Sequence, residues 1–423
     1  MDHFNYKHGV LYAEDVPVSD IVKQVGTPVY IYSSATIQRH YRVFLEPFPS
    51  SLNVMLCYAV KANDNNAIIK LLANEGAGVD AVSGGEIRRA RIAGVNPKKI
   101  VFSGVGKTTE EMAYALTERI LQFNVESEEE LRTLSQVAES LGMTANIAIR
   151  LNPDIDAGTH HKISTGKKEH KFGVEWQRAK HIYRLAADLP GINPCAISMH
   201  IGSQLLDLEP FRKAFSKIAE LLKMLRGEGH IITRLDLGGG LGIPYHEEVI
   251  PPTPKDYADV VSEATKDLGC SLVFEPGRLI VGNSGILVTQ VIYEKKTESR
   301  NFLIVDAAMN NLIRPTLYDA YHHIIPVVQS SSNTVQHLVD VVGPICETGD
   351  VLAMQRLMPT CNPGDLLAIR SAGAYGSVMG STYNSRPLLA EVMVKGDTFD
   401  VIRPRQTYEE LFAKDHIPTW LKA

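Results

Sequence analysis

The fold is decided by the stretch Val54-Met-Leu-Cys-Tyr-Ala-Val60 and by two similar runs that follow it, Gly78-Val-Asp-Ala-Val82 and Ile100-Val-Phe-Ser103. Each run is short, apolar and rich in strand-forming residues, and each is followed by a segment long enough for a helix. The same alternation continues to residue 275, with five further strands expected at 121–125, 145–151, 196–201, 233–237 and 271–274. Eight strands with interleaved helices, such as 128–141 and 208–226, predict an α/β fold. We expect a closed (β/α)8 TIM-like barrel rather than an open doubly wound sheet.

The alternation of strands and helices ends after Pro276, because the following strands have no long helices between them. They are expected at 286–293, 302–306, 337–343, 365–370 and 388–394. This pattern predicts a C-terminal, mainly antiparallel β domain, built as a β-sandwich or barrel. A strand at 30–32 precedes the barrel and could join that domain. The expected domains are therefore a barrel at 36–280 and a β domain at 281–423, joined by an N-terminal strand segment at 1–35.

Composition excludes several classes of function. The 423 residues are 44% hydrophobic, and 43 Lys and Arg against 48 Asp and Glu give a net charge of -5. Such a chain is globular and lacks the positive charge that nucleic acids and anionic membranes attract. Five scattered cysteines without metal-ligand spacing indicate reduced thiols, a cytoplasmic location and no metal site. The most apolar window, 279–293, is shorter than the ~20 residues that span a bilayer, so no membrane partner is expected.

Polar residues follow the predicted strands at their carboxyl ends, where barrels of this kind carry their chemistry. Lys61 ends the first strand. Desolvation at the barrel mouth would lower its pKa and favour a nucleophilic amine, although a lysine with its head in solvent is the simpler interpretation. The other strand ends carry Asp80, Arg150, Asn152 and His200.

Two glycine-containing segments follow the seventh and eighth strands, where barrels commonly bind phosphate. Gly238-Gly-Gly240 would leave backbone N–H groups beside a helix start, and Gly277-Arg278 adds a cation. A triple glycine alone is more often a turn. Together with the first-strand lysine it predicts pyridoxal 5'-phosphate. Glu275 would then keep the ring nitrogen of the cofactor protonated, with an ion pair to Arg278 as the alternative.

His200 has three interpretations: a core histidine with satisfied hydrogen bonds, a zinc ligand, or a ring that stacks on a planar cofactor. Its strand has no second His or Cys at ligand spacing, which favours stacking. The segment 152–173 is rich in His, Lys and Gly and has no apolar periodicity. It is expected to be a lid or a solvated loop.

These residues belong to motifs that run through nearly the whole chain, and with them the chain resembles the barrel-type pyridoxal-phosphate decarboxylases. This family includes the diaminopimelate, ornithine and arginine decarboxylases. The barrel motifs are Tyr58-Ala-Val-Lys-Ala-Asn63, Val82-Ser-Gly-Gly-Glu86, Asn124-Val-Glu-Ser127, His161-Lys-Ile-Ser-Thr-Gly166, Lys171-Phe-Gly173, His200-Ile-Gly-Ser-Gln204, Leu237-Gly-Gly-Gly240 and Glu275-Pro-Gly-Arg278. In the β domain they are Arg314-Pro-Thr-Leu-Tyr318, Gly343-Pro-Ile-Cys-Glu347 and Ala372-Gly-Ala-Tyr-Gly376.

The resemblance implies a role for each site residue. Lys61 would bind the cofactor covalently, His200 would stack on its ring, and Glu275 would meet the pyridine nitrogen. The remaining cofactor contacts implied are Asp80, Ser203, Gly239, Gly240, Gly277, Arg278 and Tyr375. Substrate contacts are implied for Arg278, Arg314, Tyr318, Glu347 and Tyr375. Cys346 would protonate Cα in the active site of the neighbouring subunit of a homodimer; without the motif it would be taken as an inert buried thiol.

The resemblance further implies an amino-acid decarboxylase, and the substrate depends on the distal group. Arg278 and Arg314 suit a distal carboxylate, and Glu347 suits an ammonium group. Meso-2,6-diaminopimelate has both groups, so its conversion to L-lysine and carbon dioxide, the last step of lysine biosynthesis, is expected. The alternatives are a decarboxylase of carboxynorspermidine or of another basic amino acid, and a non-catalytic, regulatory relative that binds the cofactor. A racemase would place a cation, rather than Glu275, on the pyridine nitrogen.

Overall fold

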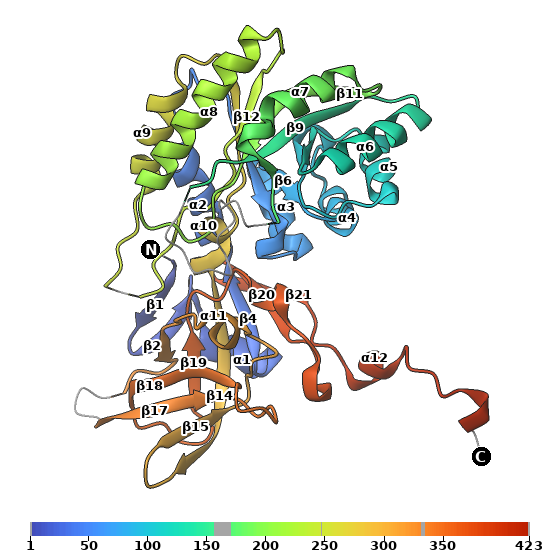
Figure 1. Cartoon of the computed structure of the whole chain (residues 1–423). Coiled ribbons are helices and arrows are strands. Elements are labelled where there is room, and N and C mark those ends of the chain that lie inside the picture. The colour runs from blue at the N-terminus through green and yellow to red at the C-terminus, as the bar shows by residue number, and fades with distance from the viewer. Residues whose placement is uncertain (1, 156–170, 247, 331–334, 422–423) are drawn as a thin grey trace. The chain divides into compact units, whose positions relative to one another are not determined.

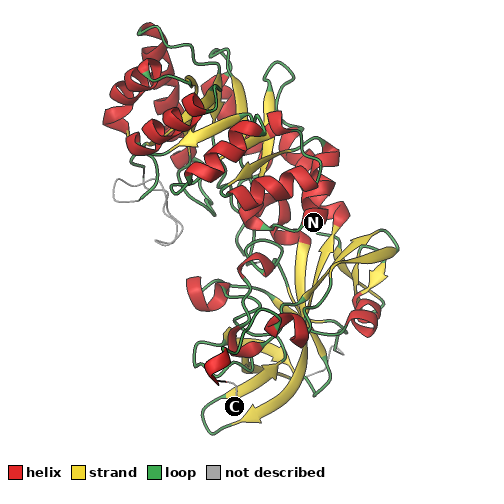
Figure 2. Ribbon diagram, turned by 90° about the vertical axis from the view of Figure 1, so that its right-hand side faces the viewer, coloured by secondary structure: helices red, strands yellow, loops and turns green. Residues whose placement is uncertain are grey.

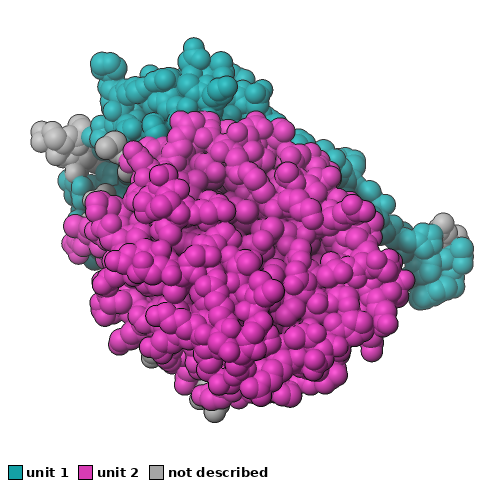
Figure 3. Space-filling view, turned by 90° about the horizontal axis from the view of Figure 1, so that it is seen from above, with its two compact units in different colours: residues 1–36, 283–423 teal, residues 37–282 magenta. Residues whose placement is uncertain are grey.

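The computed structural model describes residues 2–155, 171–246, 248–330 and 335–421. The chain divides into two compact units, Ile37–Gly282 and a second unit made of Met1–Thr36 with Asn283–Ala423 (Figure 3). Each unit is described by itself. No helix in the described ranges is long and apolar enough to cross a membrane.

The unit Ile37–Gly282, here called the barrel unit, contains a closed barrel of eight parallel strands (Figure 1). The strand order runs from β5 through β9 to β11, β12 and β13. The pairing of β13 with β5, in which Leu272 lies opposite Val54, closes the sheet. The predicted TIM-like barrel is confirmed, and the expected strand ends differ by a few residues. The strands are β5 (Val54–Ala59), β6 (Gly78–Ala81), β7 (Ile100–Phe102), β8 (Gln122–Val125), β9 (Ala145–Asn152), β11 (Ile192–Met199), β12 (Arg234–Asp236) and β13 (Ser271–Phe274), with a short β10 (Val174–Glu175) beside β9.

Helices flank the barrel strands (Figure 2), and most of those that follow a strand begin at a polar cap. Ser83 and Ser127 each accept a hydrogen bond from the backbone N–H three residues later, and Thr108 and Thr253 form capping boxes. Each cap contributes about 1 kcal/mol and fixes where a strand-end loop becomes helix. The helices are α2 (Ser34–Leu45), α3 (Asn66–Glu75), α4 (Gly84–Ile92), α5 (Thr109–Thr117), α6 (Glu128–Ser140), α7 (Ala179–Asp188), α8 (Glu209–Gly227), α9 (Pro254–Thr265) and α10 (Arg278–Val281).

The barrel strands are buried on both faces, which explains their near-continuous apolar sequences. Cys57, Val101 and Val273 form an apolar cluster. Other buried positions on the strands are polar and include Asp80, Gln122, Asn124 and Asp236. Because a buried polar group is costly unless it is hydrogen-bonded, these side chains require partners within the barrel.

The other unit is built on a mainly antiparallel sheet with the order β18-β17-β15-β14-β4-β20-β21, and β19 pairs with β14 and β16. The strand expected at 30–32 is β4, which pairs with β14 and β20. Two pairings, β4 with β20 and β15 with β17, are parallel. The strands are β4 (Val29–Ser33), β14 (Gly285–Lys296), β15 (Asn301–Val305), β16 (Ile324–Pro326), β17 (Gln336–Val342), β18 (Val351–Pro359), β19 (Leu366–Ile369), β20 (Ala390–Lys395) and β21 (Thr398–Arg403).

Several strands of this unit were not expected from the sequence. β16, β18 and β21 were missed, as was the small sheet of β1 (Phe4–Lys7), β2 (Val10–Ala13) and β3 (Val16–Pro17). β18 and β21 form the two ends of the sheet order, and their outward residues include exposed Met354, Leu357 and Val401. An edge strand of this kind lacks the regular alternation that marks a strand half-buried in a sheet.

Candidate active site

Lys61 lies in a single 3-10 turn (Val60–Ala62) directly after β5. Its Nζ donates to Asp80 Oδ2 at 2.6 Å, and Asp80 reaches this point from the neighbouring strand β6. The Lys61 side chain is 40% exposed, whereas that of Asp80 is fully buried. The desolvation expected for the Lys61 amine is therefore wrong. The amine is partly exposed to solvent and is paired with a carboxylate.

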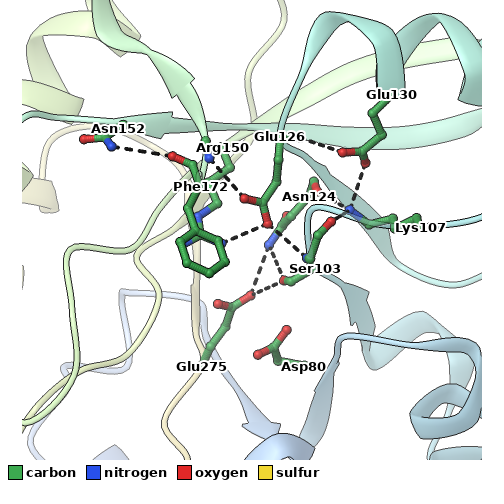
Figure 4. A network of polar contacts seen from close by, with 12 residues as sticks. Asp80, Ser103, Lys107, Asn124, Glu126, Glu130, Arg150, Asn152, Phe172 and Glu275 are labelled. Carbon is green, nitrogen blue, oxygen red and sulfur yellow. Dashed lines mark hydrogen bonds and ion pairs between the residues drawn. The ribbon is translucent and has the colours of Figure 1, made fainter. Parts of the chain in front are cut away.

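The Glu275 carboxyl follows β13 and faces polar side chains of two strands across the barrel (Figure 4). Its Oε1 accepts hydrogen bonds from Asn124 Nδ2 at 3.1 Å and from Ser103 Oγ at 3.3 Å. Burial raises the pKa of Glu275 well above its usual value, and the negative charges of Asp236 and Asp80 raise it further. Burial and these neighbouring charges thus favour the protonated form of Glu275.

Beside Glu275 lies a buried network that fixes the end of β8 (Figure 4). Lys107 donates to Gly104 O at 2.6 Å, Asn124 O at 2.7 Å and Glu130 Oε1 at 2.8 Å, with only 1% of its side chain exposed. All three protons of its ammonium group therefore have acceptors. By binding the Asn124 carbonyl, Lys107 fixes the backbone from which the Asn124 amide reaches Glu275.

Glu126 extends this network toward β9. Its Oε1 accepts from Arg150 Nη1 at 2.9 Å and its Oε2 from the Gly173 N–H at 3.0 Å. The Arg150 guanidinium also lies over the Phe172 ring, 4.9 Å from its centroid. The lid or loop expected at 152–173 lies mostly outside the described residues, as does the motif 161–166.

His200 lies just beyond β11, and its Nδ1 accepts a hydrogen bond from the Gly239 N–H at 3.3 Å. The proton of the neutral ring therefore sits on Nε2. Burial lowers the pKa of His200 well below its usual value, and the positive charges of Arg150 and Lys61 lower it further. His200 is consequently an uncharged ring that is attached to the glycine loop after β12.

The glycine loops pack closely against one another. A Cβ on Gly240, where φ is +111°, would lie 2.4 Å from Gly202 O, and one on Gly239 would lie 2.5 Å from Glu275 O. The helix start expected beside Gly238–Gly240 is wrong, because the next described helix, α9, begins only at Pro254. A helix does begin directly after Gly277, at Arg278.

Arg278 connects two of these loops. Its Nη2 donates to Ser203 Oγ at 3.1 Å and its Nη1 to the Tyr245 hydroxyl at 2.6 Å, and only 7% of the residue is exposed. The barrel unit thus brings together the predicted residues Lys61, Asp80, His200, Ser203, Gly239, Gly240, Glu275, Gly277 and Arg278 at the carboxyl ends of its strands.

The other predicted residues belong to the β unit. Arg314 begins the short helix α11 (Arg314–Tyr318), which ends at Tyr318. Arg314 is buried, and its Nη1 lies 2.8 Å from His322 Nε2. His322 Nδ1 contacts Arg370 O at 2.9 Å, so the ring donates there and accepts from Arg314 through Nε2. His322, which the sequence did not single out, orients the arginine.

Cys346 and Glu347 lie on an exposed turn. Asp350 shapes this turn by accepting hydrogen bonds from the N–H groups of Ile345 at 2.7 Å and Met309 at 2.6 Å. The alternative that Cys346 is a buried thiol is wrong for this chain. Glu347 accepts a hydrogen bond from Tyr383 and thereby raises the pKa of the Tyr383 hydroxyl.

Tyr375 has a φ of +55°, an unusual conformation for a residue with a side chain. It lies between buried Ala374 and Gly376. A Cβ on Gly376 would lie 2.5 Å from Ala372 O, so the surrounding chain is folded tightly around this tyrosine. Strained backbone of this kind is held in place by its neighbours and is common at functional sites.

Comparison with known proteins agrees with this geometry. The model of the pyridoxal-dependent decarboxylase, pyridoxal binding domain, matches residues 34–282. The chain belongs to the pyridoxal-dependent decarboxylase family. It is 48% identical over 421 residues to a diaminopimelate decarboxylase of Vibrio cholerae, covering 99% of each chain.

Solved structures of this family are also similar to this chain. The diaminopimelate decarboxylase of Helicobacter pylori complexed with L-lysine has 44% identity and a TM-score of 0.90, covering 93% of this chain and 98% of that one. The enzyme of M. jannaschii in complex with L-lysine has 37% identity and a TM-score of 0.94, covering 99% and 98%.

The barrel residues fit the pyridoxal 5'-phosphate of this family. Asp80 Oδ1 is a buried carboxylate oxygen with no hydrogen-bond partner among the described residues, although Oδ2 binds the Lys61 amine. The donors suit the cofactor chemically: an amine for its aldehyde, a buried acid for its ring nitrogen, and the Arg278 and Ser203 pair for a phosphate.

Asp236 and Ser103 complete the polar interior, and neither was singled out in the sequence. Both lie on or beside short apolar strands, in positions that an all-apolar core would fill. A carboxylate at an inward position of a central barrel strand is the signal that could have identified Asp236, since such a group requires partners.

Proposed function

We propose that this chain decarboxylates meso-2,6-diaminopimelate to L-lysine and carbon dioxide. One observation carries the proposal: a lysine amine 2.6 Å from a buried aspartate at the mouth of a barrel that matches the pyridoxal binding domain over residues 34–282. The full-length similarity to diaminopimelate decarboxylases and the L-lysine bound to two of the related structures support the choice of substrate and product.

When bound, pyridoxal 5'-phosphate supplies an electron sink for the bond between Cα and the carboxylate. Lys61 would hold the cofactor through its amine, and Asp80 would orient that amine. His200 would present a neutral ring to the cofactor, since its pKa is lowered by burial and by two nearby cations. Arg278 and Ser203 would hold the phosphate, and a neutral His200 adds no further positive charge to the site.

The Glu275 acid would hold the proton that the cofactor ring requires. Its hydrogen bonds from Asn124 and Ser103 fix one oxygen, so the carboxyl has a defined orientation before the cofactor binds. Tyr375 would also contact the cofactor, and its strained backbone supports a functional rather than a purely structural role.

Selectivity for diaminopimelate would depend on Arg314, with Tyr318 and Glu347 as further substrate contacts. A guanidinium binds a carboxylate through two parallel hydrogen bonds, whereas it repels the ammonium group in which ornithine and lysine end. The contact with His322 holds the Arg314 side chain in one orientation, which favours recognition of a planar carboxylate.

We further propose a homodimer in which Cys346 of one chain protonates Cα in the active site of the other. Cys346 and Glu347 are exposed, and hydrogen bonds hold their turn in place, including one from the Cys346 N–H to Asn384 Oδ1 at 2.9 Å. An ordered, exposed turn that carries two reactive side chains is suited to insertion into a second copy.

The substrate assignment is tested by a panel of amino acids given to the holoenzyme. Meso-diaminopimelate, ornithine, arginine and carboxynorspermidine are assayed at equal concentration for carbon dioxide release. We expect diaminopimelate to have the highest kcat/KM, because it alone presents the amino-acid carboxylate at its distal end. A higher value for any of the other three compounds would refute the assignment.

A further inference from the structure

Asp236 is a buried carboxylate at the end of β12, and three groups donate hydrogen bonds to it. Asn124 Nδ2 and Gln122 Nε2 lie 2.8 Å and 3.2 Å from Oδ2, and the Gly238 N–H lies 3.1 Å from Oδ1. The residue has no solvent-exposed surface. Burial raises the pKa of Asp236, whereas these three donors favour its ionised form.

The Asn124 amide connects Asp236 to Glu275. Its Nδ2 donates to both carboxyl groups, at 2.8 Å to Asp236 and 3.1 Å to Glu275. The amide cannot be reversed, because its Oδ1 accepts from Gln122 Nε2 at 2.8 Å, and Gln122 Oε1 in turn accepts from Arg234 Nη1 at 2.8 Å. A fixed chain of donors therefore runs from Arg234 through Gln122 and Asn124 to the two acids.

The neighbouring strands place further negative charge close to the two acids. Glu275 and Asp236 hydrogen-bond to each other, burial raises the pKa of both, and Asp236 raises that of Glu275 further. On β6, Asp80 adds a negative charge, while Lys61 after β5 is paired with Asp80. The same acids affect the Cys57 thiol on β5. Burial raises its pKa well above the usual value, and Asp236, Glu275 and Asp80 raise it further.

The remaining charges near the pair belong to other strands and have their own partners. Arg234 on β12 binds Gln122, and Arg150 on β9 binds Glu126. His200 after β11 is neutral, and Lys107 before α5 is bound to Glu130. None of these contacts neutralises Asp236, so its charge acts on Glu275.

We propose that Asp236 is a positioning residue for Glu275: through Asn124 it fixes the Glu275 carboxyl, and its negative charge keeps a proton there until the cofactor's ring nitrogen takes it. When the cofactor is bound, the proton would pass from Glu275 to its ring nitrogen, and the carboxyl groups of Glu275 and Asp236 would both stabilise the positive charge on that nitrogen. The inference rests on the role of Glu275 in the proposed function.

The test is the protonation of the ring nitrogen in the holoenzyme, followed by ¹⁵N NMR of cofactor labelled at that position. Asp236→Asn keeps the shape of the side chain and removes its charge. We expect the bound nitrogen to lose its proton at a pH about one unit or more below that of the wild type, a tenfold change in the protonation equilibrium. An unchanged titration in folded Asp236→Asn would overturn the proposal.

Asp340→Asn is the matched control. Asp340 is a buried carboxylate of the β unit that binds Arg300 at 3.1 Å and the Gln355 N–H at 2.7 Å. Its loss should lower stability and leave the ring nitrogen unaffected, which separates a charge effect from general loosening of the protein. An equal shift in both variants would also overturn the proposal.

A second measurement covers the case in which Asp236→Asn does not fold. The infrared spectrum of the cofactor-free wild type should contain a protonated-carboxyl stretch that is lost in Glu275→Gln and kept in Asp340→Asn. Absence of that band would refute the proton proposed on Glu275. Decarboxylation of meso-diaminopimelate by the wild type is assayed in parallel, so failure of the proposed function is recognised separately from failure of the inference.

Discussion

The Lys61 amine and the Asp80 carboxylate lie 2.6 Å apart at the barrel mouth, and only the lysine is open to solvent. The second oxygen of Asp80 is buried and has no hydrogen-bond partner among the described residues. An unsatisfied buried polar group costs about 1 to 3 kcal/mol, so this arrangement is poor for stability alone. The arrangement is explained if Asp80 orients the Lys61 amine that would hold the cofactor.

Replacing Lys61 by Ala should abolish both turnover and the borohydride-reducible link between cofactor and protein. The fold should persist, because the lysine lies at the barrel mouth rather than in its core. The check is mass spectrometry after reduction, together with circular dichroism. Lys98→Ala, an exposed lysine of the same unit, is the control and should retain the link. Cofactor that remains attached to Lys61→Ala would contradict the assignment.

Glu86 gives a prediction about pH. Burial raises its pKa to about 7, although its carboxylate accepts a hydrogen bond from the Val82 N–H at 2.7 Å. Between about pH 4.5 and 7, the folded protein therefore binds more protons at Glu86 than the unfolded chain does. The contribution of Glu86 to the free energy of unfolding is full below this pH range and is lost as the pH rises through it.

Glu86→Gln removes that titration. The stability of this variant relative to the wild type should therefore rise between pH 5 and pH 8, by at most ~3 kcal/mol. Denaturant midpoints of both proteins at the two pH values measure the change. Glu129→Gln, at an exposed position of α6, is the control and should show no such rise. A stability difference that is the same at both pH values would show that Glu86 titrates normally.

Most of the site residues in the barrel could be predicted from the positions of the strand ends, for a geometric reason. In a parallel barrel each strand delivers its carboxyl end to the same face, so Lys61, Asp80, His200 and Glu275 could be grouped from their positions in the sequence. The surroundings of each residue could not be predicted in this way. Asp80 as partner of Lys61 depends on the pairing of β5 with β6, and the raised pKa of Glu275 depends on burial and on Asp236, which lies on another strand.

The β unit and one loop of the barrel unit were less predictable, each for a physical reason. The edge strands of the β unit carry exposed apolar residues and lack a clear alternation, so β18 and β21 were missed. In the barrel unit, the helix expected after Gly240 follows a common arrangement in barrels, but here the next described helix, α9, begins only at Pro254. Local pattern does not determine the length of such a loop, because packing with neighbouring loops, such as that of Gly240 against Gly202, decides its path.

Arg314→Ala should lower kcat/KM for diaminopimelate by about 30-fold to about 5,000-fold, because truncating one member of a buried charge pair costs 2 to 5 kcal/mol. Arg300→Ala, a partly exposed arginine of the same unit, is the matched control and should have little effect on catalysis. Steady-state kinetics of both variants measure the difference. Equal kinetics in wild type and Arg314→Ala would show that another residue recognises the distal carboxylate.

The proposed shared site predicts complementation between two inactive variants. In a mixture of Lys61→Ala and Cys346→Ala chains, each parent homodimer has two defective sites, whereas a mixed dimer has one site with both lesions and one with neither. Random exchange makes half of the dimers mixed, so about a quarter of wild-type activity should return. The chains are unfolded, mixed and refolded, and exchange is verified by native mass spectrometry. Activity no higher than the sum of the parents would mean that each site is built from one chain.

The most direct test of the whole account is the stoichiometry of one reaction. Holoenzyme is given meso-diaminopimelate, and carbon dioxide and L-lysine are both quantified, with Lys61→Ala and Lys98→Ala assayed beside it. The account predicts equal amounts of the two products from the wild type and from Lys98→Ala, and neither product from Lys61→Ala. Loss of diaminopimelate without equal amounts of carbon dioxide and lysine, or turnover by Lys61→Ala, would contradict it.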